Sequence, residues 1–485
     1  MAGIRSADVR ARCKHPIIDS DGHLVECAPM LLDYMKRVAG PTAVERYLRS
    51  GIGAGLAAWY RLSSEQRLDH RLTRPPWWPF PTRNTLDRAT AMLPGLLYER
   101  MPELGLDFAV LYPTLGLFAL SIEDEEMRRA ACRASNEMHA ELFRGYVDRM
   151  APVAVIPMHT PSEAIDELEH AVGELGLKAI MMAGHVRRPV RGITEKHPEA
   201  SRHAYWLDTF TIDSAYDYDP VWEKCTELRV APTFHSSGMG WGSRNSPTNY
   251  VFNHLGNFAA AGEATCRALV LGGVPKRFPS LRFAFLEGGI GWACSLYSDL
   301  IGHWEKRNQE HVRNYDPALL DTARLAELMA QYGGEPFQAH VTDAGGGFLA
   351  ACSEDPGMID EFRRSGIEAL DDLRDWFGSR FYFGCEADDP INAWAFDARV
   401  NPLGLRLRPI LGSDIGHWDV TDMREVVEEA WELVEHEIVS EADFRDFVFG
   451  NAVRLWTALN PSFFAGTAIE ADVSREQRAE QVETR

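Results

Sequence analysis

The chain has 485 residues, of which 45% are hydrophobic and 25% charged, a balance typical of globular proteins and not of disordered ones. This length exceeds one minimal domain and fits either one large α/β domain with insertions or two to three ordinary domains. The net charge of -21 argues against the extended basic surface that the many phosphates of a nucleic acid require, so nucleic acid is not expected as a partner.

Short β-type runs alternate with longer helix-period segments through most of the chain. The apolar residues of these runs are continuous rather than alternating, which indicates parallel strands covered on both faces. Eight such units predict an α/β fold of the (β/α)8 TIM-barrel class, with a doubly wound open sheet as the alternative. In chain order the predicted strands are 16–19, 108–112, 153–157, 179–182, 231–235, 283–287, 381–386 and 410–414.

Two stretches interrupt the repeat. Residues 40–105 form a predicted insertion after strand one, and its proline-rich part, 74–83, suits neither helix nor central strand. Trp77 and Trp78 in this part indicate either a packed elbow or a lid over a pocket. Residues 303–375 form a helical insertion between strands six and seven. We therefore expect one barrel domain over residues 1–465, followed by a polar tail at 466–485.

The cysteines and the longest apolar run bear on the compartment. The eight cysteines are scattered without a C-x-x-C pair, as in reduced cytoplasmic proteins. The first residues lack the apolar core of a signal peptide. The run from Phe108 to Ile122 contains a proline and is too short to span a bilayer. We expect a cytoplasmic protein without a membrane partner.

Ionisable side chains stand at five of the eight predicted strand ends. Active sites of barrels lie at the carboxyl ends of the strands, where these groups would face one another. Taken singly, each residue has an ordinary explanation, such as a hydrogen-bonded core histidine or a helix cap. Together, so many buried carboxylates would repel one another unless a cation held them, which predicts a metal site. The residues are Asp21, His23 and Glu26 after strand one, His235 after strand five, Glu287 after strand six, Glu386 after strand seven, and Asp414 with His417 after strand eight.

Four motifs in order resemble one protein family. They are the D-x-H of strand one, the histidine of strand five, "GVPKRFPSLRFAFLEGGIGW" at 273–292, and G-S-D after strand eight, followed by "FGNAVRLW" at 449–456. This pattern is similar to that of the amidohydrolase-related, aminocarboxymuconate-semialdehyde decarboxylase-like branch of the amidohydrolase superfamily. The resemblance covers residues 15–460 and implies a distorted barrel, with metal ligands at Asp21, His23, His235 and Asp414.

The chain departs from the family pattern in its donors. Asp21 replaces the usual first histidine or glutamate, Glu287 replaces a histidine, and strand four lacks the bridging lysine of binuclear relatives. Carboxylates in place of nitrogen ligands favour iron or manganese over zinc. Within this family, the segments "SDGHLVE" at 20–26, "CEADD" at 385–389 and "GSDIGHWD" at 412–419 resemble the nonheme di-iron monooxygenase of platensimycin-type diterpenoid biosynthesis, an antibiotic pathway. This resemblance implies two iron ions, the second held by Glu287 and Glu386, with dioxygen and an electron donor as partners.

On this interpretation the enzyme would hydroxylate a bulky hydrophobic acid or its coenzyme A ester. Trp77 and Trp78 would form an apolar wall, Arg74 and Arg83 would meet the anionic group, and His417 and Glu26 would move protons. The alternative is a hydrolase or nonoxidative decarboxylase of a carboxylated substrate with one zinc or manganese ion. A third possibility is an inactive barrel that only binds a ligand. Assembly into a homodimer is left open.

Overall fold

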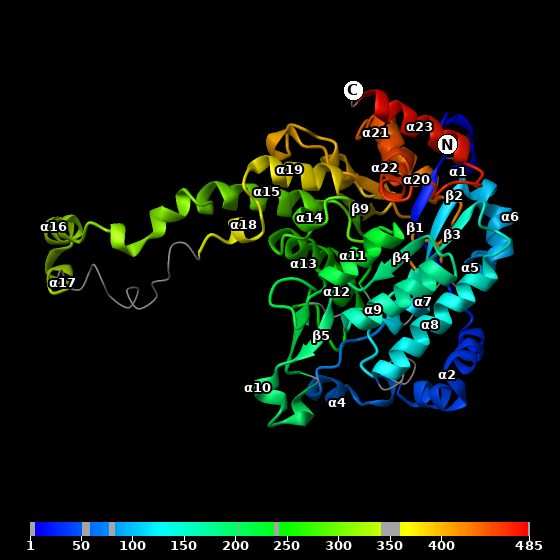
Figure 1. Cartoon of the computed structure of the whole chain (residues 1–485), viewed down its shortest axis with the longest axis horizontal. Coiled ribbons are helices and arrows are strands. Elements are labelled where there is room, and N and C mark those ends of the chain that lie inside the picture. The colour runs from blue at the N-terminus through cyan, green and yellow to red at the C-terminus, as the bar shows by residue number, and fades with distance from the viewer. Residues whose placement is uncertain are drawn as a thin grey trace.

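Eight parallel strands form a nearly closed barrel in the computed structural model, which describes residues 5–50, 59–76, 83–201, 203–236, 242–340 and 359–483 (Figure 1). The neighbour order is β1-β2-β3-β4-β7-β8-β9-β10. This confirms the predicted barrel and excludes the open sheet. The strands are β1 Ile18–Leu24, β2 Phe108–Pro113, β3 Met150–Val155, β4 Ala179–Met182, β7 Pro232–Phe234, β8 Phe283–Phe285, β9 Phe381–Cys385 and β10 Pro409–Leu411.

Helices surround the barrel and cover the outer faces of its strands (Figure 1). Every residue of the eight strands is buried, which is why their apolar runs are continuous. The larger helices are α2 Ala28–Ser50, α6 Pro94–Leu104, α8 Glu125–Leu142, α9 Pro161–Leu168, α11 Asp219–Leu228, α13 Asn257–Leu271, α15 Gly291–Arg307, α19 Leu370–Ser379 and α20 Val426–Glu435. Shorter helices include α1 Ser6–Arg12, α5 Thr85–Met92, α7 Thr114–Ala119, α12 Tyr250–His254, α14 Val274–Arg277, α18 Glu361–Arg364, α21 Glu441–Arg445 and α22 Asn451–Thr457.

Helix α8 shows how the sequence produces this packing. The side chain of Asp124 accepts a hydrogen bond from the backbone N–H of Met127 and caps the helix. On the inward face, the amide of Asn136 bonds both backbone groups of Val155 in β3, at 2.7 and 3.0 Å. Buried polar groups of this kind must be paired, so this contact holds the helix in register with the strand.

The insertion after β1 lies partly beside the loop that follows β7. It includes α4 Ser64–Asp69, and the backbone N–H of Arg74 donates to the carbonyl of Ser246 at 2.9 Å. The hydroxyl of Thr73 lies 2.8 Å from the side-chain oxygen of Asn245. These bonds place residues 73–74 on the carboxyl side of β7, the side on which the predicted insertion was expected.

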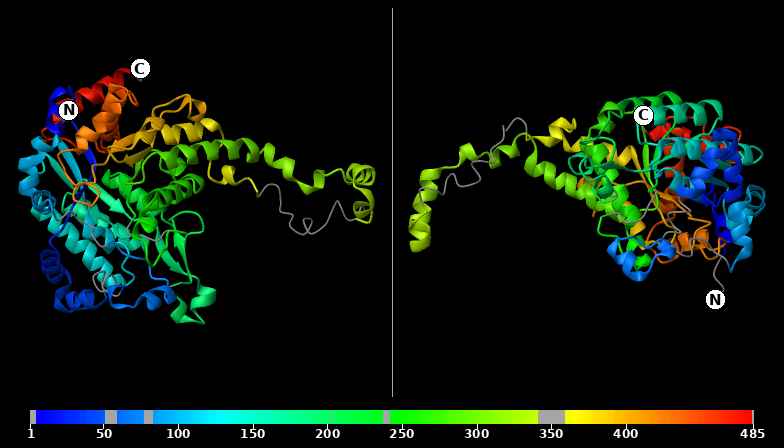
Figure 2. Two further views of the ribbon diagram at one scale, coloured as in Figure 1. Left: turned by 180° about the vertical axis from the view of Figure 1, so that it is seen from behind. Right: turned by 90° about the horizontal axis from the view of Figure 1, so that it is seen from below.

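The insertion between β8 and β9 projects away from the barrel as an arm (Figures 1 and 2). It begins beyond α15 and carries α16 Thr322–Tyr332 and α17 Gly334–Gln338, neither of which has a buried residue. The predicted insertion at 303–375 therefore starts inside α15, whose first part packs on the barrel. None of the described helices combines the length and apolar composition that a membrane span requires.

Two elements differ from the sequence prediction. An antiparallel hairpin of β5 Val186–Pro189 and β6 Tyr205–Asp208, followed along the chain by α11, was not predicted; α10 Arg191–Thr194 lies between its strands. The expected loose tail contains helix α23 Glu470–Glu483, which is held to α22 by ion pairs from Arg454 to Glu476 and Glu480. These contacts join residues distant in sequence, so the local polar composition did not reveal them.

Candidate metal centre

Strand β1 supplies two of the predicted ligands, Asp21 and His23, from positions two residues apart. Such positions point to the same side of a strand. The barrel closes beside them, because the backbone N–H of Asp414 donates to the carbonyl of Asp21 at 3.1 Å. The N–H of His23 in turn donates to the carbonyl of Ile415 at 3.1 Å. These two bonds bring the end of β10 against β1 and thereby assemble residues from opposite ends of the chain.

Asp19, which was not predicted as a site residue, reinforces this closure. Its buried carboxylate accepts hydrogen bonds from the hydroxyl of Ser413 at 2.5 Å and from the N–H of Ser413 at 3.1 Å. It also accepts from the N–H of Asp21 at 3.2 Å. Burial raises the pKa of Asp19 to about 6, although these bonds oppose the shift. Asp19 therefore orients the backbone of both ligand-bearing segments.

The other predicted ligands follow β7, β8 and β10, as the barrel interpretation requires. Glu287 and Asp414 adopt positive φ angles of 55° and 49°, a left-handed conformation that residues other than glycine rarely adopt. Such a conformation costs about 1 kcal/mol or more and often occurs at functional sites. Gly412 is also constrained, because an added Cβ would lie 2.9 Å from the Cβ of Asp21.

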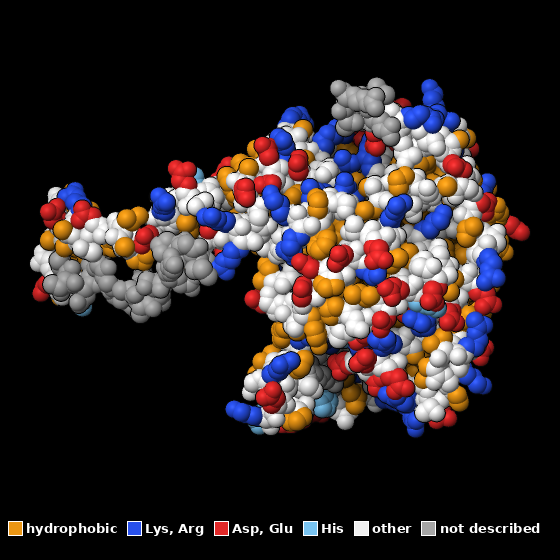
Figure 3. All heavy atoms as spheres, in the orientation of Figure 1, with side chains coloured by type: hydrophobic (Ala, Val, Ile, Leu, Met, Phe, Trp, Pro, Cys, Tyr) orange, Lys and Arg blue, Asp and Glu red, His pale blue; other side chains and the backbone are white. Residues whose placement is uncertain are grey.

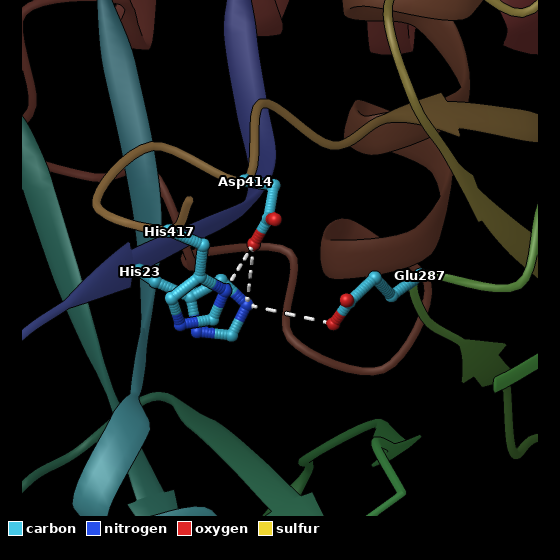
Figure 4. A group of neighbouring side chains, drawn as sticks. All are labelled: His23, Glu287, Asp414 and His417. Carbon is cyan, nitrogen blue, oxygen red and sulfur yellow. Dashed lines mark ion pairs between the residues drawn. The ribbon is translucent and has the colours of Figure 1, made fainter. Parts of the chain in front are cut away.

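The side chains converge on His23 (Figure 4). Its Nε2 lies 3.4 Å from Oδ1 of Asp414, 3.7 Å from Oδ1 of Asp21 and 4.0 Å from Oε2 of Glu287. Oε2 of Glu287 lies 2.7 Å from Nε2 of His235. Two donor groups result and share His23, each with ligand atoms within 4.8 Å of one another: His23, Glu287, Asp414 and His417; and Asp21, His23 and His235.

Buried polar atoms in this cluster lack hydrogen-bond partners among the described residues. They are Oδ1 of Asp21, both ring nitrogens of His23 and Oδ2 of Asp414. Nε2 of His235 and Oε2 of Glu287 face each other at 2.7 Å, and Oδ1 of Asp414 faces Nδ1 of His417 at 2.6 Å. An unpaired buried polar group is costly, and this cost falls when a cation binds it. The residues present therefore fit a metal ion.

The pKa values show the same electrostatic strain. Burial, followed by the charges of neighbouring carboxylates, raises the pKa values of Asp21 and Asp414 well above normal. Burial and the adjacent His417 and His235 lower the pKa of His23 well below normal. Burial alone would raise the pKa of Glu287, but its hydrogen bond with His235 and the charges of His235, His417 and His254 together outweigh burial and lower it. A cation would favour the ionised carboxylates and the neutral imidazole, which are the forms that bind metals.

Backbone and side-chain acceptors orient two of the imidazoles. Nδ1 of His235 lies 3.2 Å from the carbonyl of Ser236, so Nδ1 is protonated. Nε2 donates to Glu287 when the imidazole is charged, and it is left for a cation when that proton is lost. Nδ1 of His417 lies 2.6 Å from Oδ1 of Asp414, and its Nε2 lies 3.0 Å from the hydroxyl of Thr114. Thr114 follows β2 and was not predicted as a site residue.

Two predicted site residues lie outside both donor groups. Glu386 is exposed just beyond β9, and its pKa is raised to about 7 by partial burial and by the charges of Asp419, Glu287, Asp388 and Asp389. Its position favours a role at the rim rather than as a ligand.

Glu26 is buried elsewhere and accepts hydrogen bonds from the N–H groups of Leu115 and Gly116, at 2.8 and 3.0 Å. These bonds give it a structural explanation in place of a catalytic one.

The predicted substrate residues are less clearly placed. Arg74 donates to the carbonyl of Thr248 at 3.0 Å and lies 5.2 Å from the ring of Trp59, so it connects the insertion to the loop after β7. Arg83 is exposed. Trp77 and Trp78 lie outside the described residues. Substrate binding by these four side chains stays a prediction.

The sequence did contain signals for the two residues that were missed. Asp19 is a carboxylate within a buried apolar run, and a carboxylate in such a place is costly unless it has partners. Thr114 ends "LYPT" at the carboxyl end of the second predicted strand, the same edge as the metal ligands. Threonine is not ionisable, so the pattern of ionisable residues at the strand ends does not point to Thr114.

Several solved structures are similar to this chain over most of its length. A 2,6-dihydroxybenzoate decarboxylase from Rhizobium is 15% identical with a TM-score of 0.49, covering 91% of this chain and 99% of its own. A dihydroxybenzoic acid decarboxylase from a Polaromonas strain, solved with manganese and 2-nitroresorcinol, is 16% identical, with a TM-score of 0.49 and coverages of 91% and 97%. A 4-oxalomesaconate hydratase from Rhodopseudomonas palustris is 16% identical, with a TM-score of 0.44 and coverages of 96% and 99%. Likenesses this distant assign no activity to this chain.

The family model gives a firmer result. The model described as amidohydrolase matches residues 18–336, more than half of the chain, and includes Asp21, His23, His235 and Glu287. Asp414 and His417 lie beyond the matched segment, and barrel closure brings them to it. By this match the chain belongs to the amidohydrolase family.

Proposed function

We propose that this protein is a metal-dependent hydrolase whose divalent cation is held by Asp21, His23, His235, Glu287 and Asp414. The observation that carries the proposal is the set of buried donor atoms without hydrogen-bond partners, all arranged around His23. When bound, the cation would supply a Lewis acid that polarises the substrate and lowers the pKa of water. Imidazole and carboxylate donors together suit manganese, zinc or iron.

Asp414 and His417 provide the means to move a proton. Oδ1 of Asp414 and Nδ1 of His417 are 2.6 Å apart, and the side chain of His417 is 13% exposed. A proton taken from water by Asp414 can therefore pass to the imidazole and be returned to a leaving group. Glu287 and His235 form the opposite side of the site, where their hydrogen bond orients both groups.

The rim of the site favours an uncharged or cationic substrate. It carries the carboxylates of Glu386, Asp388, Asp389 and Asp419, whose mutual repulsion contributes to the raised pKa of Glu386. Among the described residues, none of the four forms an ion pair with lysine or arginine. A carboxylated substrate would be repelled at this rim, so hydrolysis is favoured over decarboxylation.

A di-iron monooxygenase is the second candidate, and one observation favours it. The two donor groups overlap only at His23, and together they contain three carboxylates, enough to hold two adjacent cations. Anionic oxygens stabilise the higher oxidation states that oxygen activation requires, and a second cation would relieve their repulsion. Dioxygen, an electron donor and a hydrophobic acid or acyl-CoA substrate belong to this candidate alone.

Metal analysis and three assays of the same preparation distinguish these functions. The protein purified without added metal should contain about one divalent ion per chain. It should hydrolyse members of a panel of neutral esters, lactones and amides. Release of carbon dioxide from aromatic acids would identify a decarboxylase instead. Two irons per chain with substrate-dependent oxygen uptake would contradict the hydrolase and establish the monooxygenase.

A further inference from the structure

Three arginines stand immediately before three adjacent strands. Arg282 precedes β8, Arg380 precedes β9 and Arg408 precedes β10. Because the strands are parallel neighbours, these residues meet at the amino end of the barrel, opposite the metal centre. Figure 3 shows basic side chains gathered between α19 and the helices α22 and α23.

None of the three guanidinium groups forms an ion pair with a carboxylate among the described residues. Each donates to backbone carbonyls: Arg282 to Pro279, Ser280 and Leu281 at 3.0 to 3.3 Å, Arg380 to Pro275, and Arg408 to Gly378. Each guanidinium has five N–H donors, so donors remain on all three. In a chain with 71 acidic and 50 basic residues, three neighbouring half-buried arginines without ion pairs are unexpected.

The arginines repel one another. Burial, and to a smaller degree the charge of Arg408, lowers the pKa of Arg282. Burial and the charge of Arg282 likewise lower the pKa of Arg380. Positive charges held close together in a partly desolvated place are unfavourable unless an anion lies between them. The buried carboxylates of the metal centre need a cation for the same reason.

An open pocket of about 840 Å³ adjoins this cluster. Arg282 and Arg408 line it, together with Arg406, which pairs with Asp443, and Arg454, which pairs with Asp446, Glu476 and Glu480. Asp446 and Glu480 also line the pocket, and both are neutralised by Arg454. Apolar and aromatic side chains, including Phe396, Leu407 and Tyr382, form other parts of the wall. Arg408 lies 5.6 Å from the ring of Tyr382. The volume is within the range of small-molecule sites and far exceeds that of a lone inorganic anion.

We infer that this pocket binds a phosphate monoester of a small organic molecule, with Arg282 and Arg408 on the phosphate and the apolar wall against the organic part. Planar guanidinium groups donate paired hydrogen bonds to phosphate oxygens, which favours phosphate over a single-point anion. The site is separate from the metal centre, so the inference does not depend on the proposed hydrolase function.

Calorimetric titration of the full-length protein tests this inference. The probes are inorganic phosphate, ribose 5-phosphate and adenosine monophosphate, with citrate as a carboxylate anion. We expect one saturable site per chain, with at least one monoester binding tenfold or more tightly than inorganic phosphate. Absence of saturable binding by every phosphate probe, or citrate binding as tightly as the best monoester, would overturn the inference.

Three variants locate the binding. Arg408→Gln and Arg282→Gln should each weaken monoester binding at least tenfold, whereas Arg399→Gln, an exposed arginine paired with Asp397, should leave it unchanged. Because phosphate also binds metal ions, His235→Ala serves as a second control and should retain monoester binding. Loss of binding in His235→Ala with normal binding in Arg408→Gln would place the ligand at the metal centre and contradict the inference. Circular dichroism of each variant checks folding.

Discussion

The hydroxyl of Thr114 determines which nitrogen of His417 faces the metal centre. Thr114 Oγ1 lies 2.9 Å from the carbonyl of Leu24, which can only accept, so the hydroxyl proton is donated there. Its lone pair then accepts from Nε2–H of His417 at 3.0 Å. The other nitrogen, Nδ1, is directed at Asp414 and keeps a lone pair for a cation or a proton.

Removing this acceptor should weaken metal binding. Thr114→Val keeps the shape of the side chain but cannot accept a hydrogen bond, so His417 loses its fixed orientation beside the ligand Asp414, from whose Oδ1 its Nδ1 lies 2.6 Å away. We expect the affinity for Mn²⁺ or Zn²⁺ to fall by about 10- to 100-fold, as for other groups that orient metal ligands. Titration of the metal-free protein measures this, and Thr114→Ser should retain the wild-type affinity. Equal affinities in the valine and serine variants would show that the contact does not orient a ligand.

His235→Ala should lose bound metal. His235 is fully buried, and its Nδ1 is held by the carbonyl of Ser236, so its Nε2 is the atom available to a cation. Alanine leaves no nitrogen at this position to bind the metal. Elemental analysis of the purified variant should show less than a tenth of the wild-type metal content. His303→Ala, an exposed histidine on α15, is the matched control. Full metal occupancy in His235→Ala would mean that His235 has only a structural role.

Glycine and alanine at position 287 should differ in stability. Both substitutions remove the carboxylate, but only glycine adopts the observed φ of 55° without strain. Glu287→Gly should therefore be more stable than Glu287→Ala by about 1 kcal/mol in chemical denaturation of the metal-free protein. At Glu263, inside helix α13, the order should reverse, because alanine favours a helix interior. If alanine is at least as stable as glycine at 287, the backbone there is not strained.

Glu26 should make the protein less stable as the pH rises. Burial raises the pKa of Glu26 to about 7, from 4.5, while the N–H groups of Leu115 and Gly116 oppose the shift. The folded state keeps a proton on Glu26 that the unfolded state releases. The contribution of Glu26 to the free energy of unfolding is therefore fully present below about pH 4.5, and about 3 kcal/mol of it is lost as the pH rises through 7. Glu26→Gln should remove this loss.

The pH test compares urea denaturation of wild type and Glu26→Gln at pH 5 and pH 8. The comparison cancels the contribution of His139, whose pKa burial lowers to about 3 and which both proteins share. Glu195→Gln, an exposed glutamate, should show no pH-dependent difference from wild type. A constant difference between wild type and Glu26→Gln at both pH values would contradict the raised pKa and reopen a catalytic role for Glu26.

The sequence alone determined the strands and the edge of the barrel at which the candidate metal centre lies. Strands buried on both faces leave a continuous apolar run, so the predicted run 179–182 coincides with β4 and the others overlap their strands. The first prediction, 16–19, ends too early, because β1 continues to Leu24 and contains Asp21 and His23. Ionisable residues directly after such runs are unfavourable unless they serve a purpose, and this marked Asp21, His235 and Asp414 in advance. These signals are local, because they depend on the burial of neighbouring residues.

The tertiary structure decided which of these residues meet. Asp414 reaches His23 only because the barrel closes, with Ser413 held by Asp19 across 394 positions. Glu386 and Glu26 follow strands in the same way, yet one is directed to solvent and the other to the start of α7. The direction of a side chain just past a strand depends on the loop backbone, such as the positive φ of Glu287. A positive φ at a residue other than glycine has no local sequence signal, which is why residue types and spacing could not predict it.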